Sequence, residues 1–156
     1  MGETMSAINL SKYIIQKCYE GGISDLSNKK LQKLLYYVQA WNLVFYNKKA
    51  FSEDIEAWIH GPAIPAVYRL YKNFVFSPIP QSMADGFDDI TKELSSVVDD
   101  VIRVYGKFDA DYLETLTHAE SPWQTARNDA KPFENSSNVI STDEMKTYYG
   151  KKLKTA

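Results

Sequence analysis

Residues 34–46 read LLYYVQAWNLVFY, and this stretch decides the fold. Only Gln39 and Asn42 in it are neither apolar nor aromatic. Because a helix that is hydrophobic all round is a buried helix, the stretch predicts a central helix that the other elements surround. It is shorter than the ~20 apolar residues that a membrane span requires. Ser27 is the expected N-cap, so we place this helix at about residues 27–46.

Apolar residues at helical spacing also occur on both sides of the central helix. Ser6 is a plausible cap for a helix over residues 7–20, and a strongly periodic stretch follows a loop at residues 76–89. Two capping boxes, which begin at Ser121 and Ser141, mark later helix starts. The last helix is expected to run from residue 142 to about 149 and to end at Gly150. The sequence therefore predicts a mainly α, compact helical bundle.

The hydrophobic period changes between residues 51 and 63. Residues 55–60 read as a short strand that stops at the Gly61-Pro62 turn. A stretch near residues 49–51 is the expected partner, which gives a small β-hairpin near 49–60. On this strand Trp58 and His60 share one side, and we expect a packed tryptophan beside a hydrogen-bonded core histidine.

Length and composition indicate one globular domain. The chain has 156 residues, of which 44% are hydrophobic and 13% aromatic, whereas disordered chains lack aromatic residues. The single cysteine, Cys18, excludes an intramolecular disulfide. We expect one domain at residues 7–150, flexible termini at 1–6 and 151–156, and a cytoplasmic location.

The net charge of −2 hides two halves of opposite sign. Residues 1–78 carry a net charge of +3, and residues 79–156 carry −5. A protein that grips phosphate backbones usually has a strongly basic footprint, so we expect no nucleic acid as partner. We also expect no membrane, because no apolar run approaches the ~20 residues of a membrane span. The simpler interpretation of the acidic half is a solvated helix face with acidic helix starts. The alternative is a field that steers a protein partner with a basic face.

Lys29, Lys30 and Lys33 crowd the first turns of the central helix. The helix dipole disfavours cations there by ~0.3–1 kcal/mol each. The simpler interpretation is a set of solvated lysines, and the alternative is a site for an anion or an acidic partner. These lysines are also the only local candidates for contact with DNA.

Motifs for catalysis, metal binding or cofactor binding are missing. His60 and His118 do not have the spacing of zinc ligands, and no glycine-rich phosphate loop occurs. We therefore expect no enzyme, no metal and no cofactor. An enzymatic alternative would have to be built on one of these two histidines.

A second polar cluster joins His118, Glu120, Trp123 and Arg127. Trp123 and Arg127 are four residues apart, so the guanidinium can lie over the indole ring. Glu120 is placed to pair with Arg127 across the start of a helix. We interpret the cluster as a structural polar network.

Three segments, at residues 29–41, 56–68 and 116–127, together resemble the Panacea domain family of phage-associated GepA-like and SocA-like proteins. The positions that carry the resemblance are Lys29, Gln32, Lys33, Trp41, Glu56, Trp58, His60, Gly61, Pro62, Tyr68, His118, Glu120, Trp123 and Arg127. The family has no settled catalytic residues, so these positions are expected to serve folding or an interface.

The resemblance implies a mainly helical antitoxin of a toxin–antitoxin system, often encoded on a prophage or mobile element. It favours neutralisation of a cognate toxin by direct protein–protein binding. The alternative is an adaptor that delivers the toxin to a cellular protease, or a DNA-linked regulator in the same locus. We expect the contact surface on the loop at 76–87, on the acidic helix after it, or on exposed aromatics among Tyr36, Tyr46 and Tyr71.

Overall fold

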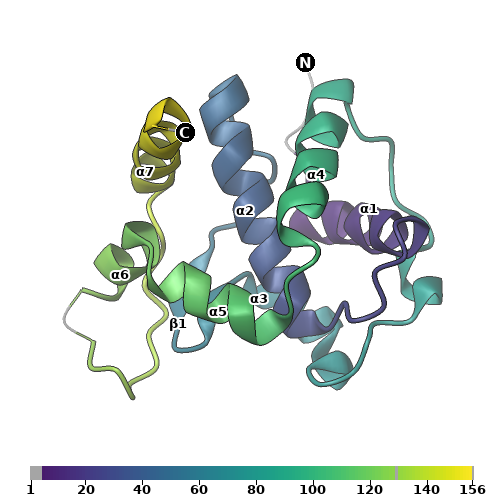
Figure 1. Ribbon diagram of the computed structural model, residues 1–156. Coiled ribbons are helices and arrows are strands. Elements are labelled where there is room, and N and C mark those ends of the chain that lie inside the picture. Colours follow the sequence, from purple (N-terminus) through teal and green to yellow (C-terminus); the bar gives the residue numbers. More distant parts are fainter. Residues whose placement is uncertain (1–4, 129, 156) are drawn as a thin grey trace.

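The computed structural model describes residues 5–128 and 130–155, and seven α-helices dominate this part of the chain (Figure 1). They are α1 (Ala7–Glu20), α2 (Asn28–Tyr46), α3 (Pro65–Leu70), α4 (Lys92–Tyr105), α5 (Ala110–His118), α6 (Ser121–Arg127) and α7 (Thr142–Thr155). Two strands, β1 (Glu56–Trp58) and β2 (Gly61–Ala63), form a hairpin, and two 3₁₀ turns are η1 (Lys72–Phe74) and η2 (Gln81–Ala84). The predicted mainly α fold is confirmed. In the described residues no helix is both long and apolar enough to cross a membrane.

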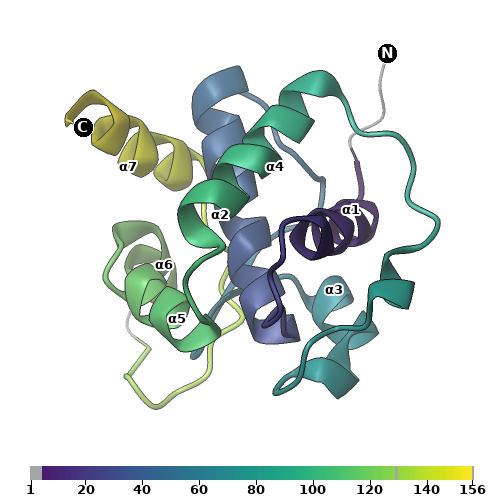
Figure 2. The same cartoon turned by 45° about the vertical axis from the view of Figure 1, so that its right-hand side comes forward.

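Helix α2 is the centre of the fold, as its sequence predicts. Fourteen of its nineteen residues are buried, and the Ser27 side chain caps it by accepting a hydrogen bond from the Lys30 backbone N–H. Figures 1 and 2 both show α2 between α4 and α7. The buried amide of Gln39 accepts from the Ala50 N–H (2.6 Å) and donates to the Phe51 carbonyl (3.0 Å). Gln39 thereby satisfies the backbone of the segment that follows the helix.

The hairpin has a different second strand from the one expected. Strand β1 pairs antiparallel with β2, in the register Glu56 to Ala63, and not with residues 49–51. The physical reason is the turn, because Gly61 has φ +107° and lets the chain reverse directly after β1. The other edge of β1 is also occupied, since the Ala57 N–H donates to the Asn138 carbonyl (2.8 Å).

The segment at residues 76–89 is not a free loop. It contains η2 and passes along α1 before it reaches α4 (Figure 2). Ile79 is fully buried: its N–H donates to the Leu26 carbonyl (2.8 Å), and its own carbonyl accepts from the Tyr19 hydroxyl (2.6 Å). Ile79 and Ala84 thus anchor the segment to the core on the α1 side, whereas most of its other residues are exposed.

Two expected helix ends are wrong. Helix α7 continues through Gly150 to Thr155, because nothing in the described structure requires the chain to turn there and a glycine inside a helix costs only ~1 kcal/mol. The N-cap of α6 is Glu120, not Ser121. Of the termini expected to be flexible, residues 1–4 and 156 lie outside the described residues.

Candidate functional site

The hairpin is the point where three distant segments with the motif residues meet. The Trp123 indole N–H donates to the Trp58 carbonyl (2.8 Å), which attaches α6 to β1. The Arg127 guanidinium lies 3.4 Å from the Ala57 carbonyl, and the Lys33 amine donates to the Pro62 carbonyl (3.2 Å). The hairpin backbone therefore receives its hydrogen bonds from α2 on one side and from α6 on the other.

Stacked aromatic and basic groups complete this region. The Arg127 guanidinium lies 5.0 Å from the centre of the Trp123 ring. The His118 ring stacks on the same indole, with the two ring centroids 3.9 Å apart. The predicted contact between Trp123 and Arg127 is thus confirmed. Arg127 is buried and donates to the Lys131 (2.9 Å) and Glu134 (2.5 Å) carbonyls. Its charge organises the segment after α6 through carbonyl groups.

Two of the three lysines at the start of α2 are buried, so the interpretation as solvated lysines is wrong for Lys30 and Lys33. The Lys30 amine donates to the Asp25 carboxylate (2.6 Å) and to the Gly106 carbonyl (2.7 Å). Other parts of the protein, and not solvent, surround the aliphatic chains of Lys30 and Lys33. The only local candidate for DNA contact therefore loses two of its three cations.

Lys29 has ion-pair partners on α5. Its amine lies 2.9 Å from the Asp111 carboxylate and 2.5 Å from the Glu114 carboxylate. Partial burial opposes its charge, but the hydrogen bonds to Glu114 and Asp111 prevail and raise the pKa of Lys29. Burial likewise opposes the charge of Glu114, and Lys29 with His60 nevertheless lowers the pKa of that carboxyl.

The two histidines differ from each other in burial. The His60 side chain is 72% exposed, with Nδ1 3.5 Å from Glu114, so the expectation of a core histidine is wrong. His60 lies in the turn after β1, where its side chain leaves the packed face of the strand. His118 is half-buried, its Nε2 has no hydrogen-bond partner in the described structure, and burial lowers its pKa.

A cavity of about 420 Å³ opens between the start of α2, the hairpin and residues 75–76. Its lining consists of Lys29, Gln32, Lys33, Trp58, Ile59, His60, Gly61, Ala63, Tyr68, Val75, Phe76 and Asn135. Trp58 and Tyr68 meet edge to face in this wall at 5.1 Å, and the Trp58 indole N–H donates to Glu56 (2.8 Å). Seven motif residues thus border one cavity, which no single segment of the sequence indicates.

Gly61 holds the hairpin against α2, and this position predicts a specific loss of stability. A Cβ at Gly61 would lie 2.5 Å from the Lys33 Cε, in addition to the positive φ. We expect Gly61→Ala to reduce the free energy of unfolding by about 1–3 kcal/mol in urea denaturation. Gly22→Ala is the matched control, because Gly22 also has a positive φ but open space around it. Equal losses for both variants would contradict the close approach of Lys33.

Glu120 lies on the other side of α6 and does not pair with Arg127, contrary to expectation. Its carboxylate accepts hydrogen bonds from the Tyr37 (2.6 Å) and Tyr149 (2.9 Å) hydroxyls. Tyr36 extends the chain, with its hydroxyl 2.9 Å from that of Tyr149. Burial raises the pKa of Glu120 against the effect of these donors. The network joins α2, α6 and α7 and is structural.

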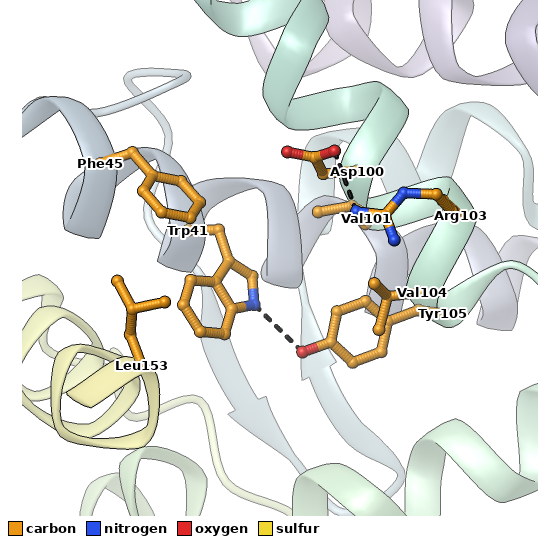
Figure 3. Close-up of a pocket in the computed structure, with 8 residues that line it drawn as sticks. All are labelled: Trp41, Phe45, Asp100, Val101, Arg103, Val104, Tyr105 and Leu153. Atoms are coloured by element: carbon orange, nitrogen blue, oxygen red, sulfur yellow. Dashed lines mark hydrogen bonds and ion pairs between the residues drawn. The ribbon is translucent and has the colours of Figure 1, made fainter. Parts of the chain in front are cut away.

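A second hollow, an apolar groove, lies between α2, α4 and α7 (Figure 3). We define it by Trp41, Phe45, Asp100, Val101, Arg103, Val104, Tyr105 and Leu153, which enclose about 180 Å³. In Figure 3 the Trp41 indole lies between Phe45, Leu153 and the Tyr105 hydroxyl, to which its N–H donates (3.0 Å). An Asp100–Arg103 pair (3.1 Å) borders the groove. Of the motif residues, only Trp41 lies here.

Exposure of the groove residues is high for apolar side chains: 47% for Phe45, 42% for Val104 and 47% for Leu153. Of the three tyrosines that we expected at a contact surface, Tyr36 and Tyr71 are fully buried and only Tyr46 is exposed. Sequence reasoning missed this surface because the apolar run at residues 34–46 predicts a buried Phe45. Val104 and Leu153 are single apolar residues in ordinary helical stretches.

Other reactive groups have structural surroundings. Burial raises the pKa of the Cys18 thiol to about 12, so it stays protonated at neutral pH. Within the described ranges, no group of three or more His, Cys, Asp or Glu side chains is arranged to hold a metal ion.

Comparison with known families decides what kind of protein carries this arrangement. The family model described as "Antitoxin SocA-like, Panacea domain" matches residues 31–124, which extend from α2 into α6. This chain belongs to the SocA-like Panacea domain family. The Panacea match includes every motif residue except Lys29 and Arg127, which lie just outside it.

A curated relative agrees with the Panacea assignment. Antitoxin SocA of Caulobacter vibrioides (strain NA1000 / CB15N) is 28% identical over 114 residues, which are 66% of this chain and 61% of SocA. The chain thus matches less than two thirds of that relative's length. No solved structure matches the chain.

Proposed function

We propose that this Panacea domain protein is an antitoxin that neutralises a cognate toxin by direct protein–protein binding. The observation that carries the proposal is membership of a family named for the antitoxin SocA, since an antitoxin needs a toxin as its partner. We extend three properties of the family to this chain: the antitoxin activity, a toxin as partner, and a cytoplasmic place of action.

The apolar groove is the surface that supports direct binding best. Three of the large apolar side chains that are exposed in the described structure line it, and they come from three different helices. Clustered exposed apolar groups are typical of protein interaction sites, and aromatic anchors supply much of the binding energy. We assign the toxin as the occupant, with an apolar side chain inserted beside Trp41.

The rim of the groove fits a protein partner as well. Asp100 on α4 is an exposed acidic group, and Arg103 follows one turn later. A polar rim around an apolar centre is the usual anatomy of an interface. Because a standard interface buries ~800 Å² on each side, the toxin would also cover the neighbouring faces of α4 and α7.

The test is co-expression of the chain with the toxin encoded beside it, followed by affinity purification. We expect wild type to restore growth and to co-purify with the toxin. Phe45→Asp is expected to weaken the complex by about 30-fold or more, since loss of an interface anchor costs ~2 kcal/mol or more. Growth rescue is expected to fail in parallel.

Phe133→Asp is the matched control, because Phe133 is also exposed but does not line the groove. It is expected to leave both rescue and the complex unchanged. Rescue by wild type without any complex would refute direct binding. Toxin loss that requires a cellular protease would identify an adaptor, and promoter binding with a steep salt dependence would identify a regulator.

A further inference from the structure

The cavity beside the hairpin contains a buried cation whose hydrogen bonds are incomplete. Lys33 is 2% exposed and lines the cavity, and its amine has one acceptor in the described structure, the Pro62 carbonyl at 3.2 Å. An ammonium group has three donors. Lys30, equally buried and on the same helix, has both a carboxylate and a carbonyl acceptor. The contrast shows that burial alone does not explain why the Lys33 amine lacks further hydrogen-bond acceptors within the described part of the chain.

We propose that this cavity binds a monoanionic carboxylate attached to an apolar body, with the carboxylate on the Lys33 amine. A ligand oxygen at this position would provide the acceptor that the protein does not. Because a buried charge is costly unless it is paired and hydrogen-bonded, the ligand would gain from a group that is already desolvated.

Charge in the cavity wall limits the ligand to a single negative charge. Lys29 is engaged by both Asp111 and Glu114, and Glu114 also lies 3.5 Å from His60. Lys33 is the cation of this wall without a carboxylate within ion-pair distance in the described structure. A phosphate dianion would place its second charge close to Glu114, where no cation is left to balance it.

The remaining walls determine the body of the ligand. Trp58, Tyr68 and Phe76 present aromatic surface, and Phe76 is fully exposed at the edge of the cavity. A volume of about 420 Å³ is within the ~300–1,000 Å³ of ordinary small-molecule sites. An aryl carboxylic acid or the C-terminal carboxylate of a chain that ends in an aromatic residue has this chemistry.

The experiment uses the full chain and follows the Trp58 indole N–H resonance by NMR during titration. Indole-3-acetate is the small probe, and a short peptide with a C-terminal tryptophan carboxylate is the second. Each has its neutral amide as control. We expect both carboxylates to shift the Trp58 resonance at millimolar concentration and to bind about 10-fold or more tighter than the amides, as expected for a hydrogen bond between charged groups.

Lys33→Met tests the assigned amine, because methionine fills a similar volume without charge. It is expected to weaken carboxylate binding about 10-fold or more and to leave binding of the amides unchanged. Lys30→Met is the matched control, since Lys30 is buried on the same helix but does not line the cavity. It should keep carboxylate binding.

The two probes separate the sources of the ligand. Tighter binding of indole-3-acetate supports the site with a small acid as its ligand, and tighter binding of the peptide supports it with a chain terminus. The proposal is overturned if neither carboxylate shifts Trp58, if the amides bind equally well, or if Lys33→Met binds as wild type does. These results are independent of toxin binding, because Phe45 and the groove are not changed.

Discussion

Glu120→Ala is expected to lower the free energy of unfolding by about 3–5 kcal/mol, the combined effect of lost hydrogen bonds and a small void. The residue is 4% exposed, and its carboxylate accepts from two buried tyrosine hydroxyls, those of Tyr37 and Tyr149. Each stranded hydroxyl costs ~1–3 kcal/mol when water cannot reach it. Domains of this size are stable by only ~5–15 kcal/mol, so the loss is a large fraction of the total.

Urea denaturation followed by tryptophan fluorescence measures this effect. Glu93→Ala is the matched control, because Glu93 is exposed in the first turn of α4 and contributes only a dipole interaction of ~0.3–1 kcal/mol. Glu120→Gln keeps a carbonyl acceptor and is expected to fall between the two. A loss below about 1 kcal/mol for Glu120→Ala would contradict this prediction. It would show that the tyrosine hydroxyls form new hydrogen bonds with water or with each other.

Lys33→Met is expected to stabilise the protein at neutral and acidic pH, with an advantage that shrinks as the pH rises. Burial lowers the pKa of Lys33 from 10.5 to about 7, against the favourable effect of Glu114. Above pH 7 the folded state has released this proton and the unfolded state still holds it. Stability therefore increases with pH by about 1.4 kcal/mol per unit from this group.

The measurement is the difference in unfolding free energy between Lys33→Met and wild type at several pH values. We expect the difference to decrease by about 2–3 kcal/mol between pH 7 and 9. Taking the difference removes the pH dependence that other groups contribute to both proteins. Among these groups are Cys18 and the buried tyrosines, whose raised pKa values reduce stability at higher pH. A constant difference over this range would contradict the lowered pKa of Lys33.

Lys30→Met, on the same helix, is expected to change the free energy of unfolding in the opposite direction. Its amine is held by Asp25 and by the Gly106 carbonyl. Removal of the amine leaves the buried Gly106 carbonyl without this donor, so the substitution is expected to destabilise the protein. Stabilisation by both substitutions would mean that the two buried lysines are equivalent, contrary to their hydrogen bonds.

Much of the fold was predictable because its signals are local. The apolar run at residues 34–46 places α2, Ser6 and Ser27 cap α1 and α2 as expected, and the spacing of Trp123 and Arg127 predicts their contact. Each prediction depends on residues that lie within a few positions of one another. Hydrogen bonding and periodicity at that range need no knowledge of the rest of the chain.

The candidate sites were predictable only in part. The interpretation of the lysines at the start of α2 as solvated failed for Lys30 and Lys33. The hairpin covers Lys33, and the chain around Gly106 covers Lys30. The prediction that residues 49–51 pair with the strand was wrong, because Gln39 binds the backbone of residues 50–51. The groove was missed because its apolar residues are divided among α2, α4 and α7, with no more than three from any one helix.

By itself, the sequence determined the helical class, the buried central helix and, through its motifs, membership of the Panacea domain family. These properties follow from interactions within single segments and from the order of those segments. Only the tertiary structure decided that Lys33 is a desolvated amine in a cavity, that Glu120 binds tyrosines rather than Arg127, and that Phe45 and Leu153 line the same groove. The physical reason is that desolvation and pairing depend on which distant groups pack together, and a residue's sequence neighbours do not specify those groups.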